Sequence, residues 1–152
     1  RLRSPLTAAN SWPHSLNNLQ QCIEYLDKLR DATEEAFNEN FPPEGPDADR
    51  YAMFQQCISE LEASKAELDG LHLSQCKEGV SMLQIHLKPM LEPLGLLDYN
   101  IGEAQYADFQ VNDPYAKAFN TQTEIIYQHV KSVLNPVSAE EVMQQLAERT
   151  CR

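Results

Sequence analysis

Two side chains with metal-ligating chemistry, His72 and Cys76, stand four residues apart in a segment of helical periodicity. Residues at this spacing share one helix face, so both could reach a single zinc ion. A structural zinc site needs four protein ligands, and the sequence has no CxxC pair and no second histidine pair to complete the set. The spacing therefore favours two ordinary helix residues, and we expect no bound metal.

Two other catalytic centres are also disfavoured by spacing. A di-iron helical bundle needs Glu-x-x-His, but the residues three positions before the four histidines are Ser11, Asp69, Leu83 and Ile126. A cysteine paired with a distant histidine can act as a nucleophile, yet Cys22, Cys57 and Cys76 all lie in helical patterns. No glycine-rich phosphate loop is present. We therefore expect no catalytic residue, no cofactor and no enzyme activity, with a metal- or thiol-dependent helical-bundle enzyme as the less favoured alternative.

The charge balance excludes several classes of partner. The 12 basic and 23 acidic residues give a net charge of -11, which repels nucleic acid phosphates and anionic lipid headgroups. No apolar run approaches the roughly 20 residues of a membrane span, and no secretory signal peptide is recognisable. The cysteines in helical patterns are expected to be reduced and to pack as small hydrophobic residues, which suits the cytosol. Because the chain begins at Arg1, we interpret it as an internal fragment.

The first half of the chain predicts two amphipathic helices. Residues 1–13 are expected to be loose. Apolar steps of three and four then predict a helix over 14–39, capped by Ser11 or Ser15 and carrying Leu16, Leu19, Ile23, Leu26, Leu29 or Arg30, Thr33 and Phe37 on one face. Prolines and a glycine predict a loop over 40–47. A helix of about 40 residues follows from Ala48, with the stripe Tyr51, Phe54, Ile58, Leu61, Lys65, Leu68, Leu71 or His72, Cys76, Val80, Leu83 and Leu87.

The second half predicts a kinked end, a corner and two more helices. Gly70 and Gly79 allow a bend in the long helix, and Pro89 and Pro93 predict a kinked end near Leu97. Residues 98–112 are expected to be irregular. Asp113 as N-cap and Pro114 as first residue open a helix to about Leu134, with Tyr115, Phe119, Gln122, Ile126, His129 and Val133 on one face.

Asn135–Pro136 is expected to stop that helix. Ser138 and Glu141 form a predicted capping box for a last helix, which places Val142, Met143, Leu146 and Ala147 on one face. The whole pattern indicates an all-α, elongated helical bundle, with residues 1–152 as a single helical-bundle fragment. The aromatic residues Tyr51, Phe54, Tyr106, Phe109, Tyr115 and Phe119 are expected mainly in the core, with an exposed partner patch as the alternative. We also expect Phe109 and Phe119 to meet at the 98–112 corner.

The ordered motifs resemble one protein family. Lys88, Pro89 and Pro93, followed by Asn112, Asp113, Pro114 and Tyr115, are similar to a Lys-Pro-x-x-x-Pro element and an Asn-Asp-Pro-aromatic element of subunit 4 of the conserved oligomeric Golgi complex. The helix from Phe54 to Leu71 and the start at Leu16 are similar to preceding family helices, so the resemblance extends over about residues 15–146. Tyr115 stands where many members carry tryptophan.

The resemblance implies a non-enzymatic, vesicle-tethering subunit of the helical-rod type. Such a protein works at the cytosolic face of the Golgi as a peripheral membrane component in retrograde intra-Golgi transport. Its implied partners are the other subunits of the complex, together with SNAREs and their regulators. The alternative is a helical subunit of a related tether such as exocyst, or another helical adaptor. The motif residues named above are expected to be structural.

Overall fold

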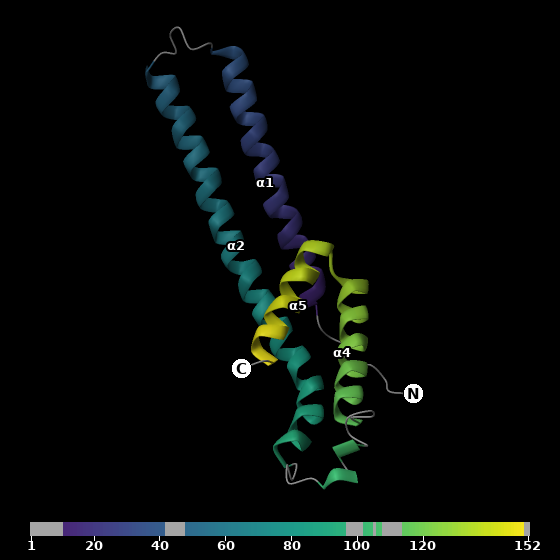
Figure 1. Cartoon of the computed structure of the whole chain (residues 1–152). Coiled ribbons are helices and arrows are strands. Elements are labelled where there is room, and N and C mark those ends of the chain that lie inside the picture. Colours follow the sequence, from purple (N-terminus) through teal and green to yellow (C-terminus); the bar gives the residue numbers. More distant parts are fainter. Residues whose placement is uncertain (1–10, 42–47, 97–101, 105, 108–113, 151–152) are drawn as a thin grey trace. The chain divides into compact units, whose positions relative to one another are not determined.

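The computed structural model describes residues 11–41, 48–96, 102–104, 106–107 and 114–150. These residues form the helices α1 (Trp12–Asn40), α2 (Ala48–Leu91), the 3-10 helix η2 (Glu92–Leu96), α4 (Pro114–Val133) and α5 (Pro136–Thr150) (Figure 1). No strand occurs in these ranges. The all-α class expected from the sequence is confirmed. The chain divides into two compact units, residues 1–75 and 76–152, so that α2 contributes to both.

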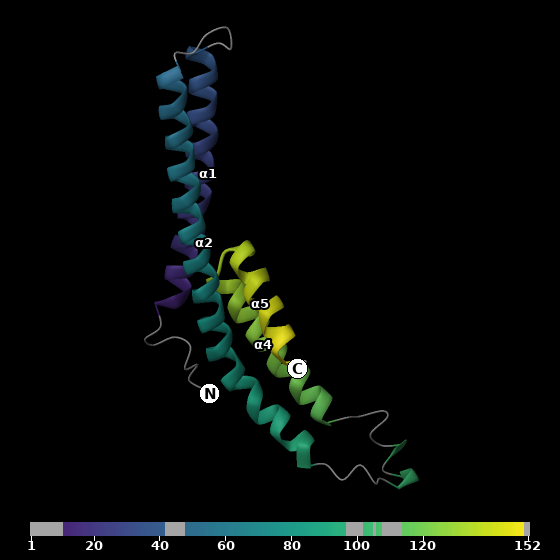
Figure 2. The ribbon, with the colours of Figure 1, turned by 90° about the vertical axis from the view of Figure 1, so that its left-hand side faces the viewer.

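The first unit contains a helical hairpin. α1 and the first part of α2 lie side by side and antiparallel in both views (Figures 1 and 2). Their apolar faces meet along a seam in which Ile23 and Ile58 are buried. At the end near the 42–47 connection, the rings of Phe37 and Phe54 stack with centroids 4.0 Å apart. The apolar stripes predicted for these two helices therefore form the hairpin core.

The stripe on α2 is continued by His72 rather than by Leu71. His72 is half-buried, whereas Leu71 is 54% exposed. The stripe shifts to His72 because steps of three and four from Leu68 allow either residue, and only packing against another element selects between them. α2 keeps its helical hydrogen-bond pattern through Gly70 and Gly79, so no break occurs there.

The second unit collects the other apolar stripes. α2 contributes Cys76, Val80, Leu83 and Leu87, and α5 contributes Val142 and Leu146. Ile126 and Val130 come from α4, and Leu134 directly follows it. These side chains are buried, and α4 and α5 lie side by side in antiparallel directions (Figures 1 and 2). The first residue of α4 is Pro114, as the sequence predicts, because proline needs no hydrogen-bond acceptor at that position.

The start of α1 differs from the sequence prediction, whereas the end of the long helix is close to it. α1 begins at Trp12, so Trp12 and Pro13 are helical and not loose, and Trp12 is only 5% exposed. Ser11 occupies the N-cap position, but its side chain makes no capping hydrogen bond. α2 extends to Leu91 with Pro89 in its last turn, and η2 ends at Leu96, close to the expected end near Leu97.

The last helix shows a further correction, because its N-cap is Asn135 and not Ser138. The Ser138 backbone N–H donates to Asn135 Oδ1 at 2.9 Å, and Pro136 is the first residue of α5. α4 ends at Val133, where Leu134 N–H still donates to the Val130 carbonyl, and Pro136 has no N–H to continue the ladder. Helix α5 therefore starts two residues before Ser138, which lies fully buried inside its first turn.

Candidate functional site

The residues expected to be structural motifs fall in the second unit where the structure describes them. Lys88 is exposed in the last turn of α2, and its ammonium lies 3.8 Å from Glu92 Oε1. Pro89 is exposed within α2, and Pro93 is half-buried in η2. Asn112 and Asp113, the expected N-cap, lie outside the described residues, as do the side chains of Pro114 and Tyr115. The structural role assigned to this motif stays a prediction.

Lys88 borders a shallow pocket at the end of α2. The pocket has a volume of about 320 Å³ and is also lined by Gln84, Ile85, Leu87, Leu91, Arg149 and Thr150. Arg149 reaches from α5 toward α2 and donates through Nη1 to Ser81 Oγ at 3.0 Å. The pocket thus joins two helices of one unit. Its lining residues include two cations and the hydroxyl of Thr150 but no acidic side chain and no histidine, so it offers no pair for acid–base chemistry.

The predicted metal and thiol candidates do not gather into a site. His72 is half-buried and Cys76 is fully buried on α2. Burial, with a smaller effect of Glu141, raises the pKa of the Cys76 thiol to about 11, which disfavours the nucleophilic thiolate. Across the described ranges, no group of three or more His, Cys, Asp or Glu side chains could hold a metal ion.

Two of the cysteines differ from their expected environment. Cys22 and Cys57 are exposed on α1 and α2, whereas Cys76 packs as a small core residue. The expectation that the three thiols would pack as small hydrophobic residues was wrong for Cys22 and Cys57, because a cysteine within an amphipathic helix can lie just beside the apolar stripe. Cys151 lies outside the described residues.

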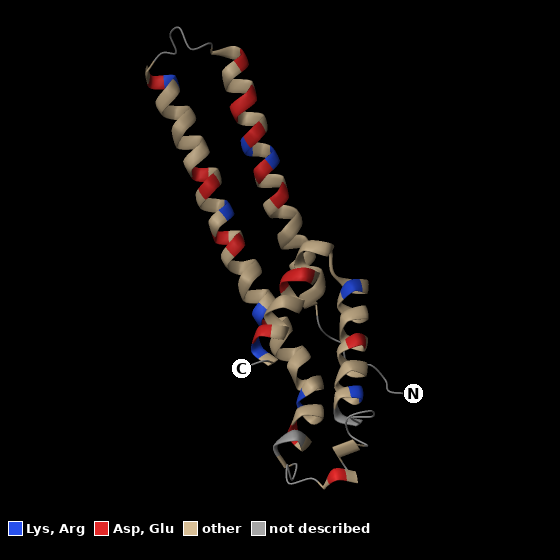
Figure 3. Ribbon diagram, viewed as in Figure 1, with Lys and Arg blue, Asp and Glu red and all other residues tan. Residues whose placement is uncertain are grey.

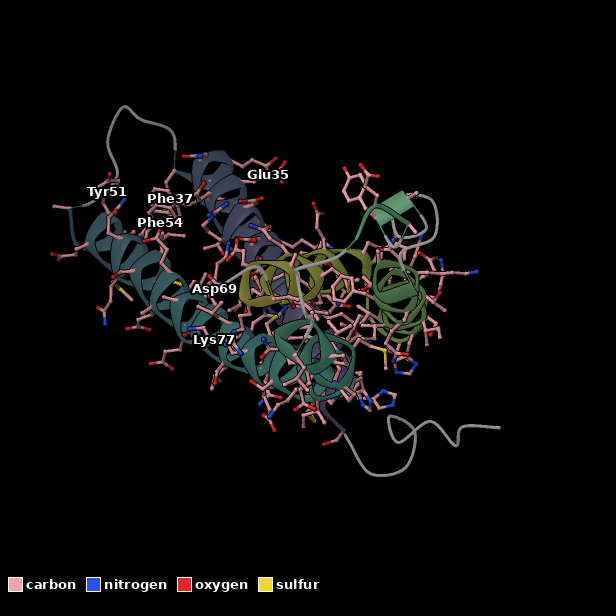
Figure 4. The ribbon with its side chains drawn as sticks, turned by 60° about the horizontal axis from the view of Figure 1, so that its bottom comes forward. Glu35, Phe37, Tyr51, Phe54, Asp69 and Lys77 are labelled. Carbon is pink, nitrogen blue, oxygen red and sulfur yellow. The ribbon has the colours of Figure 1, made fainter. Side chains whose placement is uncertain are left out.

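An aromatic cluster lies at the end of the hairpin in the first unit. Phe37, Phe41, Tyr51 and Phe54 have ring centroids 4.0 to 6.4 Å apart. Figure 4 shows Phe37, Tyr51 and Phe54 together between α1 and α2. A groove of about 570 Å³ runs beside them and is also bordered by Met53 and Arg50.

The other aromatic expectations have mixed outcomes. Phe54 is half-buried, whereas Tyr51 is 49% and Tyr106 is 58% exposed. The Tyr106 N–H donates to the Gly102 carbonyl at 2.9 Å, so a helical turn occurs within the described part of the corner. Phe119 is half-buried on α4. Phe109 lies outside the described residues, so its expected meeting with Phe119 stays a prediction.

A second groove, which the sequence analysis did not identify, lies between α4 and α5. It has a volume of about 740 Å³ and is lined by Tyr127, Val130, Lys131, Leu134, Pro136, Ala139, Glu140, Met143 and Gln144. Its signal in the sequence is the Asn135–Pro136 pair, which ends one helix and starts the next. Recognising that pair as an N-cap and first residue would have placed α4 and α5 as antiparallel neighbours.

No helix among the described residues is both long and apolar enough to cross a membrane. The pockets and grooves described above lie along or between helices. Such surfaces are suited to packing against other helices.

Comparison with known proteins places this sequence in a family. A family model described as "Conserved oligomeric Golgi complex subunit 4, C-terminal" matches residues 14–152. "Conserved oligomeric Golgi complex subunit 4" from Arabidopsis thaliana is 31% identical over 103 residues, which is 68% of this chain and 13% of that protein. The proteins of the same name from Bos taurus and Homo sapiens are each 27% identical over 128 residues, or 81% of this chain and 16% of theirs.

This chain therefore spans about one seventh of the length of the curated relatives that it matches. The resemblance found in the sequence motifs is confirmed by the family match. Because the matched segment includes nearly all of the residues, the chain belongs to the family of the C-terminal part of conserved oligomeric Golgi complex subunit 4.

Proposed function

We propose that this chain is part of a subunit of the conserved oligomeric Golgi complex that tethers vesicles in retrograde intra-Golgi transport. The observation that carries this proposal is the family match over residues 14–152. The proposed location is the cytosolic face of the Golgi membrane, as a peripheral component. The proposed partners are the other subunits of the complex, with SNAREs and their regulators as further partners of the whole protein.

The helical architecture supports a mechanical role. In the hairpin, the seam between α1 and α2 combines buried apolar residues, stacked rings and the Lys65–Asp27 ion pair, which together hold two long helices in one register. A paired helix resists bending better than a single helix and can hold binding surfaces apart. We propose that the chain acts in this way as one segment of a longer subunit, and that it carries out no chemical reaction.

The motif residues have a structural part in the proposal. Pro89 lies in the last turn of α2, Pro93 lies in η2 directly after it, and Pro114 begins α4, so these prolines stand where the chain leaves one helix and enters the next. We propose that Lys88, Asn112, Asp113 and Tyr115 support the same corner and bind no ligand.

A binding experiment tests the assignment. The tagged chain is mixed in parallel with purified subunits of the conserved oligomeric Golgi complex and with purified exocyst subunits. We expect retention of Golgi-complex subunits alone. A matched pair of variants, Leu83→Asp in the core and Ile85→Asp on the surface of the same helix, distinguishes a fold-dependent interaction from adhesion by an unfolded chain.

A cellular experiment tests the finer role. In cells lacking subunit 4, the human relative is expressed with its matching segment replaced by residues 14–152 of this chain. We expect the chimera to assemble with the other subunits and to restore the Golgi location of resident enzymes. A stable, folded chimera that binds exocyst subunits, or that joins no complex, would contradict the proposal.

A further inference from the structure

α1 carries a second apolar stripe next to the seam with α2. Its members are Cys22, Tyr25, Leu29, Ala32 and Ala36, at steps of three, four, three and four. All five are exposed, with Tyr25 at 69% and Leu29 at 52%. Each precedes a residue of the seam stripe by one position, which rotates this outer stripe by about 100° around the helix. Within the hairpin, α2 does not cover it.

The spacing of the outer stripe suits a helical partner. Steps of three and four are the pattern by which one helix packs its side chains against another. The stripe extends over about 21 Å at 1.5 Å per residue, or roughly four helical turns. Tyr25 and Leu29 are large, whereas Ala32 and Ala36 are small, so the second half of the stripe leaves room for bulky side chains from a partner.

An acidic rim borders the outer stripe on the side remote from the seam. It consists of Glu24, Asp31, Glu35 and Glu39, all exposed, with Lys28 as the basic member, whose ammonium lies 5.5 Å from the centre of the Tyr25 ring. Asp31 pairs with Arg30 at 2.8 Å. Within the described ranges, no basic group lies at ion-pair distance from Glu35 or Glu39. Figure 4 shows Glu35 extending away from Phe37 and Phe54.

We propose that the outer stripe and acidic rim of α1 bind one basic amphipathic helix of a partner protein. The stripe supplies apolar area, and Glu35 and Glu39 are placed to pair with lysine or arginine beside the partner's apolar face. This surface goes beyond the Golgi assignment, because it specifies the chemistry of a partner rather than its name.

The negative charge of α1 disfavours two other occupants of the outer stripe, a second copy of this chain and an anionic membrane surface. α1 contains six acidic and two basic residues, and acidic side chains outnumber basic ones along both helices of the hairpin (Figure 3). A second copy of α1 would bring two acidic rims together, and an anionic membrane surface would be repelled in the same way. A basic helix is attracted and also supplies the missing counter-charges.

Two synthetic peptides of about 21 residues test the charge preference. Both carry leucine at the two apolar heptad positions; one has lysine at the flanking positions and the other has glutamate. Binding to the full 152-residue chain is measured by fluorescence anisotropy at low and high salt. We expect the lysine peptide to bind at least about tenfold more tightly than the glutamate peptide, with an affinity that falls as salt rises.

Variants of the chain test the location. Leu29→Asp should weaken binding of the lysine peptide by at least about tenfold. Ile125→Asp, at a comparably exposed position on α4 with 56% exposure, should leave binding unchanged. The pair Glu35→Lys and Glu39→Lys retains the apolar stripe and should remove most of the salt dependence. Circular dichroism and melting curves check that each variant is folded.

The following outcomes would contradict binding of a basic helix to the outer stripe. Equal binding of the two peptides, no binding of the lysine peptide, or an equal loss on Ile125→Asp would overturn the proposal. Sedimentation would report a second copy as the occupant if the unmodified chain forms a dimer that Leu29→Asp converts to a monomer. If Leu29→Asp unfolds the chain, the result from Glu35→Lys with Glu39→Lys decides the question, because those exposed changes leave the helix seam intact.

Discussion

The Lys65 ammonium lies 2.6 Å from Asp27 Oδ1 and 2.8 Å from Asp27 Oδ2, across 38 residues of sequence. Lys65 stands on the apolar stripe of α2, and its partner comes from α1 beside the seam. A charged residue in that position restricts the register of the hairpin, since sliding one helix by a turn would leave the ammonium without its carboxylate. Leu26 and Leu61 line the same small pocket as the two charged residues.

The Lys65–Asp27 pair predicts a pH dependence of stability. The hydrogen bond from Lys65 holds the pKa of Asp27 below its ordinary value, so the folded state favours the ionised carboxylate. The resulting stabilisation is present at neutral pH and is lost as pH falls below about 4 and the carboxylate is protonated. Asp27→Asn should therefore melt below the unmodified chain at neutral pH, and the two melting temperatures should converge in acid.

Asp69→Asn is the control for that experiment, because Asp69 is an exposed carboxylate on α2. It should show no comparable pH-dependent difference. If the difference in melting temperature between Asp27→Asn and the unmodified chain stays constant from neutral to acid pH, the Asp27 charge does not stabilise the hairpin.

Leu83 and Ile85 form a matched test of the core in the second unit. Leu83 is fully buried, whereas Ile85, two residues along the same helix, is 67% exposed. Leu83→Ala should cost about 2–5 kcal/mol of unfolding free energy through lost burial and a cavity. Ile85→Ala should change it by no more than about 0.5 kcal/mol. Urea denaturation followed by circular dichroism measures both, and similar losses would place the core elsewhere.

Asn135 is predicted to be the side chain that initiates α5. Asn135→Ala removes the acceptor of the Ser138 N–H and should cost about 1 kcal/mol. Val137→Ala, at an exposed neighbouring position, serves as the control and should have a much smaller effect. Thermal melts compare these variants with Ser138→Ala. If Ser138→Ala costs more than Asn135→Ala, the capping role belongs to Ser138 after all.

Thiol reactivity should separate the cysteines by environment. Cys22 and Cys57 are exposed, whereas Cys76 is buried with a pKa raised to about 11. Only the thiolate attacks an alkylating reagent. Iodoacetamide should therefore modify Cys22 and Cys57 in the native chain and Cys76 only after denaturation. Peptide mass spectrometry gives the order in which the cysteines are alkylated. Modification of Cys76 at the same rate as Cys22 would contradict the burial of Cys76.

Much of the local structure was predictable from the sequence. The steps of three and four at Leu16, Ile23, Ile58 and Leu83 predicted helices with those residues inward, because a helix that buries one face must repeat its apolar positions near its own period. Pro114 and Pro136 also marked helix boundaries, since proline lacks the N–H that a helix interior requires. The family resemblance used Pro114 together with Lys88, Pro89 and Pro93.

The tertiary structure decided what lies opposite each face. It selected His72 over Leu71, gave Lys65 its partner in Asp27, and left Cys22 and Cys57 exposed although both stand in helical patterns. It also showed that α1 has a second, uncovered stripe. Periodicity reports which residues share a helix face, because that depends on neighbours along the chain. Burial and pairing depend on residues that are distant in sequence, and only the packing of one helix against another brings those together.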